Sequence, residues 1–457
     1  MIFFVLIISL IVRVWYVIIP TIIWWDTAMY VGIGKYIFSG GVIGIWEPFR
    51  PILLPLILGS VWKIGLDPLI VGKILMVIAG LALIWFTYKI GEAIEEHSGV
   101  YAAILVGFTP MTIMFTNYPL TDVPSTLFTV IAFYLIITKK YFWSGITLAL
   151  AFLFRFPQIL AVVPLAASIW LLSGKVKNIL LFGIGAAVLI VPFLISNYIQ
   201  FQDPLYPITT GSTVAAQSVH AGPQDYLYYV KGLLGQNPLL IFAIVPLILV
   251  AFKRKVFPHT KIILATLLFV IILGGYFSHT RHQEVRYGLA FLPYVALLAG
   301  YGFTHIIRRL QFRFAYHIAV VGITLLMLGV CGYVYTNYSS SIHINPDYKA
   351  YISYFKDKGN QTLMTSSPQV VAFSNVSIKA APSTWEHADK IFDEFKTQVN
   401  FIALNTCELV CEDPATCPNA RASVTNKIEQ QTRLFYKEIY DCKLYILEPK
   451  QYINAVN

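Results

Sequence analysis

Apolar stretches long enough to cross a lipid bilayer recur through the first three quarters of the chain. The hydrocarbon core of a bilayer is about 30 Å thick, and a helix needs roughly 20 apolar residues to cross it. We expect eleven such helices, near residues 2–20, 68–88, 99–116, 123–138, 142–156, 157–172, 177–196, 236–252, 261–277, 287–306 and 314–335. The sequence therefore predicts an all-α polytopic membrane protein.

The amino-acid composition supports this class. Only 12% of the 457 residues are charged and 57% are hydrophobic, whereas soluble proteins carry about 25% charged residues. Residues 1–337 hold 21 of the 33 Lys and Arg residues but only 10 of the 23 acids. A basic surplus in short loops between apolar spans sets membrane topology. Because no basic face is clustered, we expect membrane lipids and no nucleic acid as partners.

The orientation in the membrane depends on the apolar segment 51–64, which has about 14 residues, starts with two prolines and suits an interfacial or re-entrant helix. If it does not cross, the main basic groups all fall on one side, which the positive-inside rule makes cytoplasmic. These groups are Lys139/Lys140, Lys175/Lys177, Lys253/Arg254/Lys255 and Arg308/Arg309/Arg313. The glycosylation-type triplets at Asn337, Asn360 and Asn375 then fall on the outer side. We expect a multi-pass cell membrane protein with an extracytoplasmic C-terminus.

Residues 338–457 change character, because apolar runs shorten and polar residues return. Helical patterns at 347–358, 386–398 and 423–440 alternate with β-type runs at 362–365, 399–404 and 444–447. This alternation predicts a small extracytoplasmic α/β domain. We therefore expect two domains, a transmembrane catalytic domain over 1–337 and an α/β domain over 338–457.

Four of the five cysteines lie in this second domain: Cys407, Cys411, Cys417 and Cys442. An even number of cysteines in an outer domain indicates two disulfides, for which three pairings are open. A zinc site is the alternative, but no histidine lies among the four. Cys331 falls in the last apolar span and is expected to be an inert core residue.

Seven of the ten acids of residues 1–337 map to the outer side, while Glu92, Glu95 and Glu96 fall in a cytoplasmic loop with a solvated face. The seven are Asp26, Glu47, Asp67, Asp122, Asp203, Asp225 and Glu284. Ionisable groups near a bilayer are costly and tend to be functional. We expect Asp67 and Asp225 only to hydrate loops, and the other five to serve a site.

Two of these acids lie in the first outer loop. Asp26 follows Trp24-Trp25 at the water boundary, where its carboxylate either acts as a general base or caps a helix that starts at Thr27. Glu47 and Arg50 precede the proline-started helix. Arg50 either binds a phosphate at headgroup level or anchors the chain in lipid.

The remaining candidates follow later spans. Asp122, in a tight turn before Pro124, either caps the next helix or orients a group in a site. Arg155 either pairs with an outer acid or reaches the surface along the bilayer. The run from His279 to Tyr287 packs two histidines, two arginines and a glutamate into nine residues. There Arg286 and His282 can donate to phosphate oxygens, whereas metal binding is disfavoured because no HExxH-type spacing exists.

Together these motifs resemble the C-type glycosyltransferase superfamily. The resemblance rests on Asp26-x-x-x-Tyr30, the Arg50-Pro51 helix, Thr121-Asp122-x-Pro124 and the loop from Asn197 to Pro207. The run from His282 to Tyr287 is similar to the His-Lys-Glu-x-Arg-Phe signature of lumenal mannosyltransferases. Within this superfamily the chain resembles the dolichyl-phosphate-mannose protein mannosyltransferases and the lipid A aminoarabinose transferases. The resemblance covers residues 1 to about 310, with Thr27 and Gln283 departing from the usual Glu and Lys.

The resemblance implies transfer of a sugar, a hexose such as mannose, from a polyprenyl-phosphate or dolichyl-phosphate carrier to a hydroxyl of a protein, glycan or lipid. We expect one inverting displacement with Asp26 as base and Asp122 and Glu47 orienting sugar or acceptor. Arg50, Arg155, His282 and Arg286 would bind the donor phosphate or lipid. Tyr30, Asp203 and Glu284 would orient the substrate. No metal or other cofactor is expected to be obligatory.

Two other classes of function remain open at this point. A lipid or solute transporter also places charges within the membrane, but it usually shows paired broken helices in two halves or charges near the midplane. A structural subunit of a membrane complex would use the outer domain for binding. The donor sugar, the acceptor and the oligomeric state cannot be read from the sequence.

Overall fold

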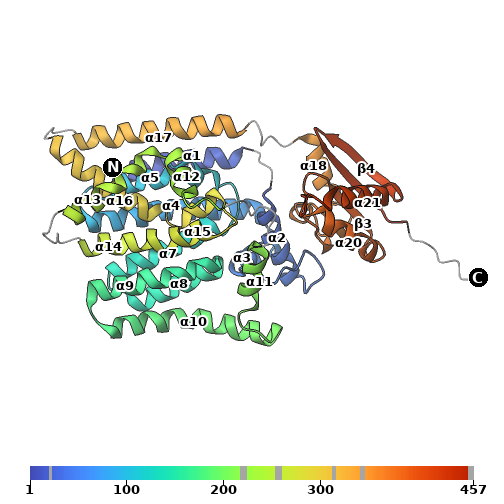
Figure 1. Ribbon diagram of the computed structural model, residues 1–457, viewed down its shortest axis with the longest axis horizontal. Helices are drawn as coiled ribbons and strands as arrows, with labels where there is room; N and C mark the ends of the chain where they lie inside the picture. The colour runs from blue at the N-terminus through green and yellow to red at the C-terminus, as the bar shows by residue number, and fades with distance from the viewer. Residues whose placement is uncertain (20–22, 217–223, 253–259, 311–314, 340–344, 451–457) are drawn as a thin grey trace, which may run out of the picture. The chain divides into compact units, whose positions relative to one another are not determined.

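The computed structural model describes residues 1–19, 23–216, 224–252, 260–310, 315–339 and 345–450 (Figure 1). The chain forms two compact units. The membrane unit comprises Met1–Ile19, Phe49–Leu53 and Lys73–Ser341, and the sheet unit comprises Pro20–Pro48, Leu54–Gly72 and Ile342–Asn457. The sheet unit thus contains two early segments that the expected domain of residues 338–457 lacks. The basic residues Lys253–Lys255 and Arg313, and the Asn337 side chain, lie outside the described residues.

Apolar helices build most of the membrane unit. Its long helices are α1 (Ile2–Ile18), α4 (Pro68–Ile94, whose first residues belong to the sheet unit), α7 (Asp122–Ile137), α8 (Tyr141–Phe154), α9 (Val162–Ser173), α10 (Val176–Phe201), α16 (Leu292–Ile307) and α17 (Ala315–Ser339). The shorter helices are α5 (Ser98–Gly107), α6 (Pro110–Met114), α11 (Tyr206–Ala216), α12 (Tyr228–Gln236), α13 (Ile244–Phe252), α14 (Thr260–Phe269) and α15 (Gly275–His279). Single turns are η1 (Phe156–Ala161), η2 (Pro238–Ala243), η3 (Val270–Gly274), η4 (Val285–Ala290) and η5 (Arg308–Leu310).

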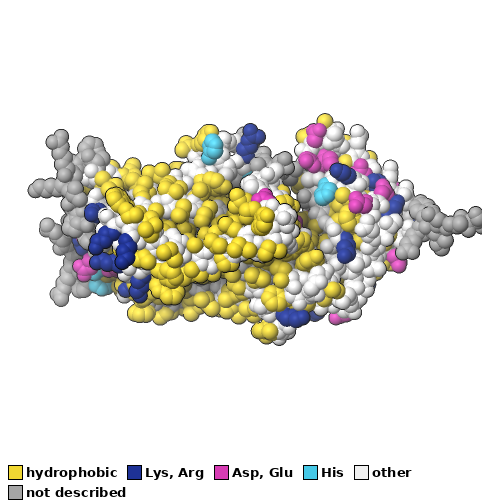
Figure 2. Space-filling view, turned by 90° about the horizontal axis from the view of Figure 1, so that it is seen from below, with side chains coloured by type: hydrophobic (Ala, Val, Ile, Leu, Met, Phe, Trp, Pro, Cys, Tyr) yellow, Lys and Arg dark blue, Asp and Glu magenta, His cyan; other side chains and the backbone are white. Residues whose placement is uncertain are grey.

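Several of these helices can cross a membrane. Five stretches are long and apolar enough, namely Pro68–Ile94, Phe156–Ser173, Val176–Phe201, Thr260–His279 and Ala315–Val334, and a sixth is the bent pair Tyr228–Gln236 and Pro238–Val250. Large apolar side chains face outward along this unit, including Leu180, Ile184 and Val188 of α10, and Figure 2 shows the broad hydrophobic surface that results. The predicted class of helical membrane protein with a small C-terminal sheet domain is confirmed. The number of eleven crossings stays a prediction.

Two breaks interrupt the apolar helices: one lies inside the helix expected at 99–116, and the other lies at the start of the helix expected at 236–252. The expected helix at 99–116 ends at Gly107 and resumes at Pro110, and α12 meets η2 and α13 at a bend of 119°. The Asn237 side chain joins the two breaks, because its Nδ2 donates to Thr109 Oγ1 at 2.8 Å. Both breaks precede a proline, which cannot donate the backbone hydrogen bond that would continue a helix.

Arg13 stabilises the first of these breaks. Its guanidinium is 1% exposed and donates to Thr112 O at 2.7 Å, to Gly107 O at 3.2 Å and to the Thr116 hydroxyl. Carbonyls at helix ends have no partner within the helix, and burying them unpaired is costly. Arg13 therefore holds the turn that leads into the segment preceding Asp122.

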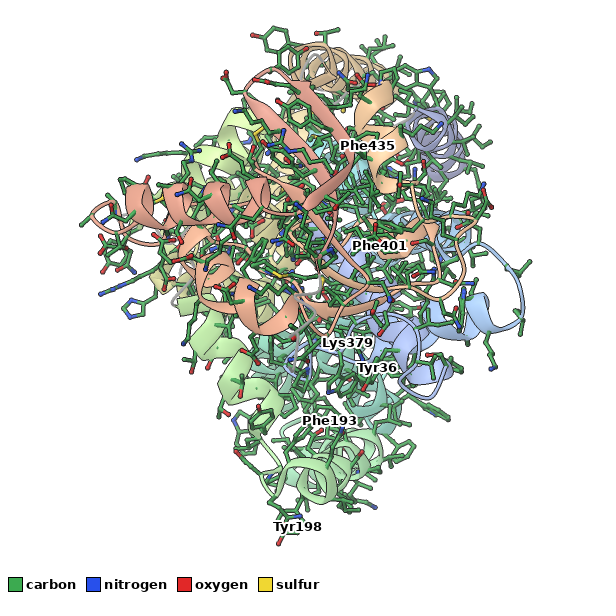
Figure 3. The ribbon with its side chains drawn as sticks, turned by 90° about the vertical axis from the view of Figure 1, so that its right-hand side faces the viewer. Tyr36, Phe193, Tyr198, Lys379, Phe401 and Phe435 are labelled. Atoms are coloured by element: carbon green, nitrogen blue, oxygen red, sulfur yellow. A yellow bond between two sulfur atoms is a disulfide. The ribbon has the colours of Figure 1, made fainter. Side chains whose placement is uncertain are left out.

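The sheet unit has a five-stranded mixed sheet in the order β2-β1-β3-β5-β4. Its strands are β1 (Thr362–Thr365), β2 (Ser377–Ala380), β3 (Phe401–Asn405), β4 (Thr432–Ile439) and β5 (Cys442–Glu448), and its helices are α2 (Trp25–Phe38), α3 (Leu53–Lys63), α18 (Pro346–Ile352), α19 (Val370–Phe373), α20 (Trp385–Phe395) and α21 (Cys417–Glu429). The strands β2, β1 and β3 pair in parallel, whereas β5 is antiparallel to β3 and β4. Phe401 on β3 and Phe435 on β4 cover part of one buried cluster (Figure 3).

The segment that contains α2 and Gly44 completes this sheet unit. Gly44 pairs with the free edge of β2, donating to Val376 O at 2.7 Å and accepting from Ile378 N at 2.8 Å. Its φ of 103° and its approach to Gly32 O leave no room for a side chain. Lys35 of α2 is 3% exposed and donates to Val371 O at 2.7 Å and Ser374 O at 3.0 Å. Met29 and Ile45 lie in the same buried cluster as Tyr351.

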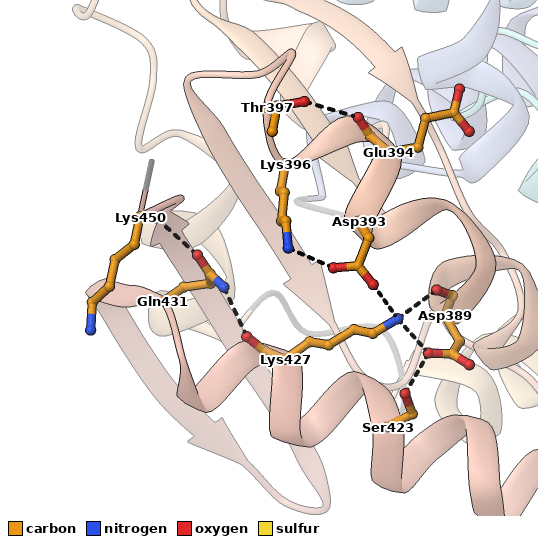
Figure 4. Close-up of polar contacts among 9 residues, drawn as sticks. All are labelled: Asp389, Asp393, Glu394, Lys396, Thr397, Ser423, Lys427, Gln431 and Lys450. Atoms are coloured by element: carbon orange, nitrogen blue, oxygen red, sulfur yellow. Dashed lines mark hydrogen bonds and ion pairs between the residues drawn. The ribbon is translucent and has the colours of Figure 1, made fainter. Parts of the chain in front are cut away.

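Ion pairs hold α20 against α21 on the other side of the sheet. Lys427 Nζ lies 2.8 Å from Asp389 Oδ1 and 2.9 Å from Asp393 Oδ2, and Ser423 Oγ donates to Asp389 at 2.6 Å (Figure 4). The hydrogen bonds from Lys396 and Lys427 hold the pKa of Asp393 below its ordinary value. These partly exposed ion pairs and hydrogen bonds join α20 to α21, whose other faces are apolar.

The structure corrects one predicted helix and resolves the cysteine pairing. The pattern at 423–440 predicted a helix, but 432–439 forms β4. Apart from the partly buried Phe435 and Ile439, its residues are exposed, so the strand lacks the alternating burial that would identify it. The disulfides are Cys407–Cys442 and Cys411–Cys417, one of the three open pairings. Cys331 is partly buried and donates from Sγ to Phe108 O at 2.9 Å.

A half-buried carboxyl group makes the stability of the sheet unit depend on pH. Glu408 follows β3 and accepts a hydrogen bond of 3.3 Å from Gln369 Nε2, and burial raises its pKa to about 7. Between pH 4.5 and 7 the Glu408 carboxyl keeps its proton in the folded state but loses it in the unfolded chain. The stabilisation from Glu408 is therefore complete below about pH 4.5 and is lost as the pH rises through 7. We expect a loss of roughly 2 kcal/mol between pH 5 and pH 8, measured as a lower hydrogen-exchange protection factor at residues 402–409 at pH 8, after correction for the intrinsic rise of the exchange rate with pH. Glu408→Gln should remove most of this pH dependence, and an unchanged pH profile in that variant would contradict the assignment.

Candidate functional site

Charged side chains gather at one end of the membrane unit. Asp122 is the first residue of α7 and Arg155 directly follows α8. The two helices are joined by a short turn, so the start of α7 and the end of α8 lie at the same end of the bundle. The run from His282 to Tyr287 forms the entry to η4, which packs against α7. The fold thus brings together residues that are separated by more than 160 positions.

A buried ion pair forms the inner part of this cluster. The Arg155 guanidinium pairs with Asp122 Oδ1, and the two side chains are only 13% and 3% exposed. The guanidinium also lies 4.5 Å from the ring centroid of Tyr287 and 5.7 Å from that of Phe277. Of the two alternatives for Arg155, the structure shows the one in which it pairs with an acid, here Asp122. Pairing within a poorly hydrated site fixes the guanidinium more strongly than a surface contact would.

Glu284 organises the outer part of the cluster. Its carboxylate lies 2.7 Å from His282 Nε2 and 2.7 Å from Arg286 Nε. Tyr287 donates to the same carboxylate at 3.1 Å, and its ring stacks under Arg155. Glu284 therefore orients two cationic side chains, and Tyr287 links them to the Asp122–Arg155 pair. We name the set Asp122, Arg155, His282, Glu284, Arg286 and Tyr287 the cation cluster.

The cation cluster can receive an anion. Arg155, His282 and Arg286 provide two fixed guanidinium groups and one imidazole, with side-chain exposures of 13, 15 and 10%. Two carboxylates balance the guanidinium charges, which lowers the cost of holding them near lipid. A phosphate oxygen that approached would compete with Glu284 for donors already pointing to one place. The arrangement suits recognition of a phosphate group.

Tyr287 is a member of the cluster that the sequence analysis did not assign a role. It closes the polar run that the resemblance singled out, and an aromatic residue also ends the corresponding family signature. Gln283, the departure from that signature, has a different task. Its Oε1 accepts a hydrogen bond from Asp225 N at 3.2 Å, and its Nε2 donates to Asp225 O at 3.0 Å. Gln283 therefore joins two loops of the membrane unit.

The sheet unit carries three of the predicted site residues. Asp26 is the second residue of α2, which begins at Trp25 rather than Thr27. The cap position is Trp24, so of the two alternatives for Asp26 the structure does not show the N-cap. In the first helical turn, a carboxylate is stabilised by the positive end of the helix dipole. Tyr30 lies one turn later and is 6% exposed, and Glu47 is partly buried just before Pro48.

Other predicted residues occupy turns. Asp203 Oδ1 accepts from Leu205 N at 2.9 Å, and within the described residues no hydrogen bond or ion pair joins it to the cation cluster. Arg50 lies between Phe49 and α3, with its guanidinium 6.0 Å from the Phe49 ring centroid. Asp67 caps α4 through Leu69 N, and Asp225 pairs with Lys231 at 2.9 Å, as expected of loop residues.

The helix α3 spans 11 residues, or about 16 Å, and is too short to cross the bilayer.

Metal-ligating side chains are not grouped in the part of the chain that the structure describes. Across the described ranges of the chain, no three His, Cys, Asp or Glu side chains are grouped as a metal site. The four cysteines of the sheet unit, considered above as zinc ligands, are paired with one another. His282, the histidine of the cation cluster, lies 2.7 Å from the Glu284 carboxylate. The cluster is thus organised by ion pairs.

The chain has the fold of the C-type membrane glycosyltransferases. ArnT from Cupriavidus metallidurans, solved bound to undecaprenyl phosphate, superimposes with a TM-score of 0.68 at 10% identity over 97% of each chain. Its apo state gives 0.62. An oligosaccharyltransferase from Archaeoglobus fulgidus, solved with a tethered acceptor peptide containing the NVT sequon, gives 0.61 at 14% identity, over all of this chain and 75% of that one.

The sequence comparison points the same way. Residues 49–196 match the family model of the dolichyl-phosphate-mannose-protein mannosyltransferases. No curated protein sequence matches the chain significantly. The matched range includes Arg50, Asp122 and Arg155. The predicted resemblance to the C-type glycosyltransferase superfamily is confirmed.

Proposed function

We propose that the protein is a membrane glycosyltransferase that transfers a sugar from a polyprenyl-phosphate carrier to a hydroxyl acceptor on the extracytoplasmic side. The observation that carries this proposal is the cation cluster, which holds Arg155, Arg286 and His282 together at one end of the membrane unit. The undecaprenyl phosphate bound to ArnT, a protein of the same fold, supports a lipid phosphate as the group recognised. A hexose such as mannose is the proposed sugar, in line with the matching family model.

The proposed chemistry is one inverting displacement. Asp26 accepts the proton of the acceptor hydroxyl while that oxygen bonds to the anomeric carbon, and the bond from this carbon to the phosphate oxygen breaks. The polyprenyl phosphate leaves with the electron pair, and Arg286 and His282 stabilise its charge. Arg155 and Arg50 bind the donor, and Glu284 keeps the cations in place. Asp122, Glu47, Tyr30 and Asp203 orient sugar or acceptor.

A transporter is a weaker proposal for this chain. The one bent helix pair and the break at Phe108–Pro110 resemble interrupted transporter helices, but Asn237 and Arg13 fill the hydrogen-bonding positions at these breaks. The ion-paired residues Asp122, Arg155, Glu284 and Arg286 gather instead where α7 begins and α8 ends. A lipid-linked substrate held at that end need not be moved across the membrane to react.

The test is a transfer assay with the full-length protein in lipid nanodiscs. The donors are polyprenyl phosphates carrying radiolabelled mannose, glucose or aminoarabinose, and the acceptors are protein, glycan and lipid fractions offered separately. We expect one donor to be consumed, with label appearing in one fraction and free polyprenyl phosphate released in equal amount. Because side-chain cations can stabilise a monophosphate leaving group, EDTA should change the rate less than about twofold. If the protein instead moves a labelled lipid across vesicles without consuming it, the proposal is wrong.

A further inference from the structure

A second basic site lies at the opposite end of the membrane unit from the cation cluster. An open groove of about 620 Å³ is lined by Leu135, Lys139, Lys140, Tyr141, Phe142, Trp143, Thr147 and Leu181. It is formed where α7 ends, α8 begins and α10 passes. Asp122 starts α7 and Lys139 follows its end, so about 24 Å of helix separates the two sites. The proposed transferase chemistry makes no use of this groove.

The backbone presents both lysines at the groove in a fixed way. Lys139 has a φ of 61°, a left-handed conformation that favours glycine or asparagine. The turn is closed by hydrogen bonds from Lys139 N to Ile136 O at 2.9 Å and from Lys140 N to Leu135 O at 2.7 Å. Both side chains are exposed, and neither forms an ion pair with any described residue. Complementing the negative end of α7 explains a basic residue here, but it does not require a groove.

The walls of the groove are rigid because the three helices are packed closely. Ser144 Oγ donates to Ala132 O at 2.8 Å and joins α8 to α7. Gly145 and Gly185 bring the backbones of α8 and α10 so close that a side chain at either position would collide with the other helix. The groove is therefore preformed and does not depend on movable loops.

Its chemistry changes from polar to apolar along its length. The two ammonium groups and the amino-terminal amides of the 14-residue helix α8 attract an anion. Trp143 is 58% exposed, and with Tyr141 it has the amphipathic character of side chains at the headgroup level. Leu135, Phe142 and Leu181 continue as an apolar wall toward the exposed surface of α10. Figure 2 shows that Lys and Arg gather at one end of the hydrophobic surface.

We propose that this groove binds one anionic phospholipid, with the phosphate at Lys139 and Lys140 and an acyl chain along Leu135 and Leu181. Charge complementarity selects a lipid with net negative charge, and the apolar wall selects a lipid over a free phosphate. The bound lipid would anchor the α7–α8 turn in the leaflet opposite the cation cluster. This inference does not depend on the proposed function.

The experiment is native mass spectrometry of the full-length protein in detergent, titrated with phosphatidylglycerol or with phosphatidylcholine of the same chain length. We expect one phosphatidylglycerol to bind, and Lys139→Gln with Lys140→Gln to weaken that binding at least about tenfold. The matched control is Lys175→Gln with Lys177→Gln, which removes the same charge from the exposed start of α10 at the same end of the bundle. It should change binding less than twofold. Leu181→Trp keeps all charges but narrows the apolar wall, and should also weaken binding.

Three outcomes would overturn the proposal. Equal losses in both lysine pairs would mean a diffuse attraction of lipid to a basic surface. Displacement of phosphatidylglycerol by glycerol 3-phosphate at similar concentration would mean a phosphate site without an acyl groove. Unchanged binding in the Lys139 and Lys140 variant, with its thermal midpoint also unchanged, would mean that the lipid binds elsewhere.

Discussion

Replacing Asp26 with asparagine is expected to lower the rate of sugar transfer by about 10² to 10⁴-fold, the range that a positioned general base contributes. The change keeps the size and polarity of the side chain but removes its ability to accept a proton. It should leave the fold intact, because Asp26 lies in the first turn of α2 and does not cap that helix. Donor binding should change little, since the phosphate would be held by residues of the membrane unit.

The matched control is Asp67→Asn, which makes the same substitution in the same unit. Asp67 caps α4, and asparagine is an equally good cap, so this variant should keep full activity. The measurement is single-turnover transfer from a labelled lipid-linked sugar, with donor binding followed separately. A folded Asp26→Asn protein with wild-type turnover would remove Asp26 from the mechanism while leaving the identity of the enzyme open.

Breaking the Asp122–Arg155 pair is expected to have the largest effect on stability. Asp122 is 3% exposed, and removing one member of a buried ion pair leaves the other charge uncompensated, at a cost of about 3–5 kcal/mol. Asp122→Asn and Arg155→Gln should each lower the thermal midpoint in detergent strongly. The double variant should lose less than the sum of the two, because it leaves no unpaired charge. Arg155→Gln should also reduce transfer, since Arg155 contacts Tyr287 of the cation cluster.

An exposed ion pair in the same unit serves as the control. Asp225 and Lys231 are 2.9 Å apart, with side chains 39% and 65% exposed, and surface pairs contribute about 0–1 kcal/mol. Asp225→Asn and Lys231→Gln should therefore have small and additive effects. Additive losses at Asp122 and Arg155 would show that the two side chains are not coupled, and would contradict the buried pair.

The sequence predicted the helical membrane class because runs of apolar residues are a strong and local signal. The break at Pro110 was harder to place, since it interrupts an apolar run without changing its composition, whereas the bend before Pro238 falls at the start of the helix expected at 236–252. β4 was mistaken for part of a helix because most of its residues are exposed and no alternation of apolar and polar residues marks it as a strand. The pairing of Gly44 with β2 joins positions more than 300 residues apart, and no local pattern in a single sequence reports such a contact.

The site was predicted in its residue types and only partly in its arrangement. The polar run at His282–Tyr287 was identifiable because ionisable groups close to two apolar spans are costly to place near a bilayer and tend to be functional. The sequence left open whether Arg155 pairs with an acid or reaches the surface, and the short turn between α7 and α8 is what places it near Asp122. The role of Glu284 as the carboxylate that orients both cations could not be read from the sequence. Side chains two residues apart share a face only where the backbone is extended, as it is at Glu284, and the pattern between two apolar spans did not establish that conformation.

The completion of the sheet unit by α2 and Gly44 also governs the order in which this protein can mature. Lys35 and Val371 are 336 positions apart, so at about 5–20 residues per second the ribosome makes them roughly 20–70 s apart. During that interval α2 has no sheet to receive Met29 or Lys35, while the membrane helices that follow are already being inserted. The loop that contains α2 and Gly44 therefore has no strand to pair with until the last quarter of the chain has been made. Asp26 gains its final surroundings only when synthesis is nearly complete, so a prematurely terminated chain would keep its membrane helices but not an assembled first loop.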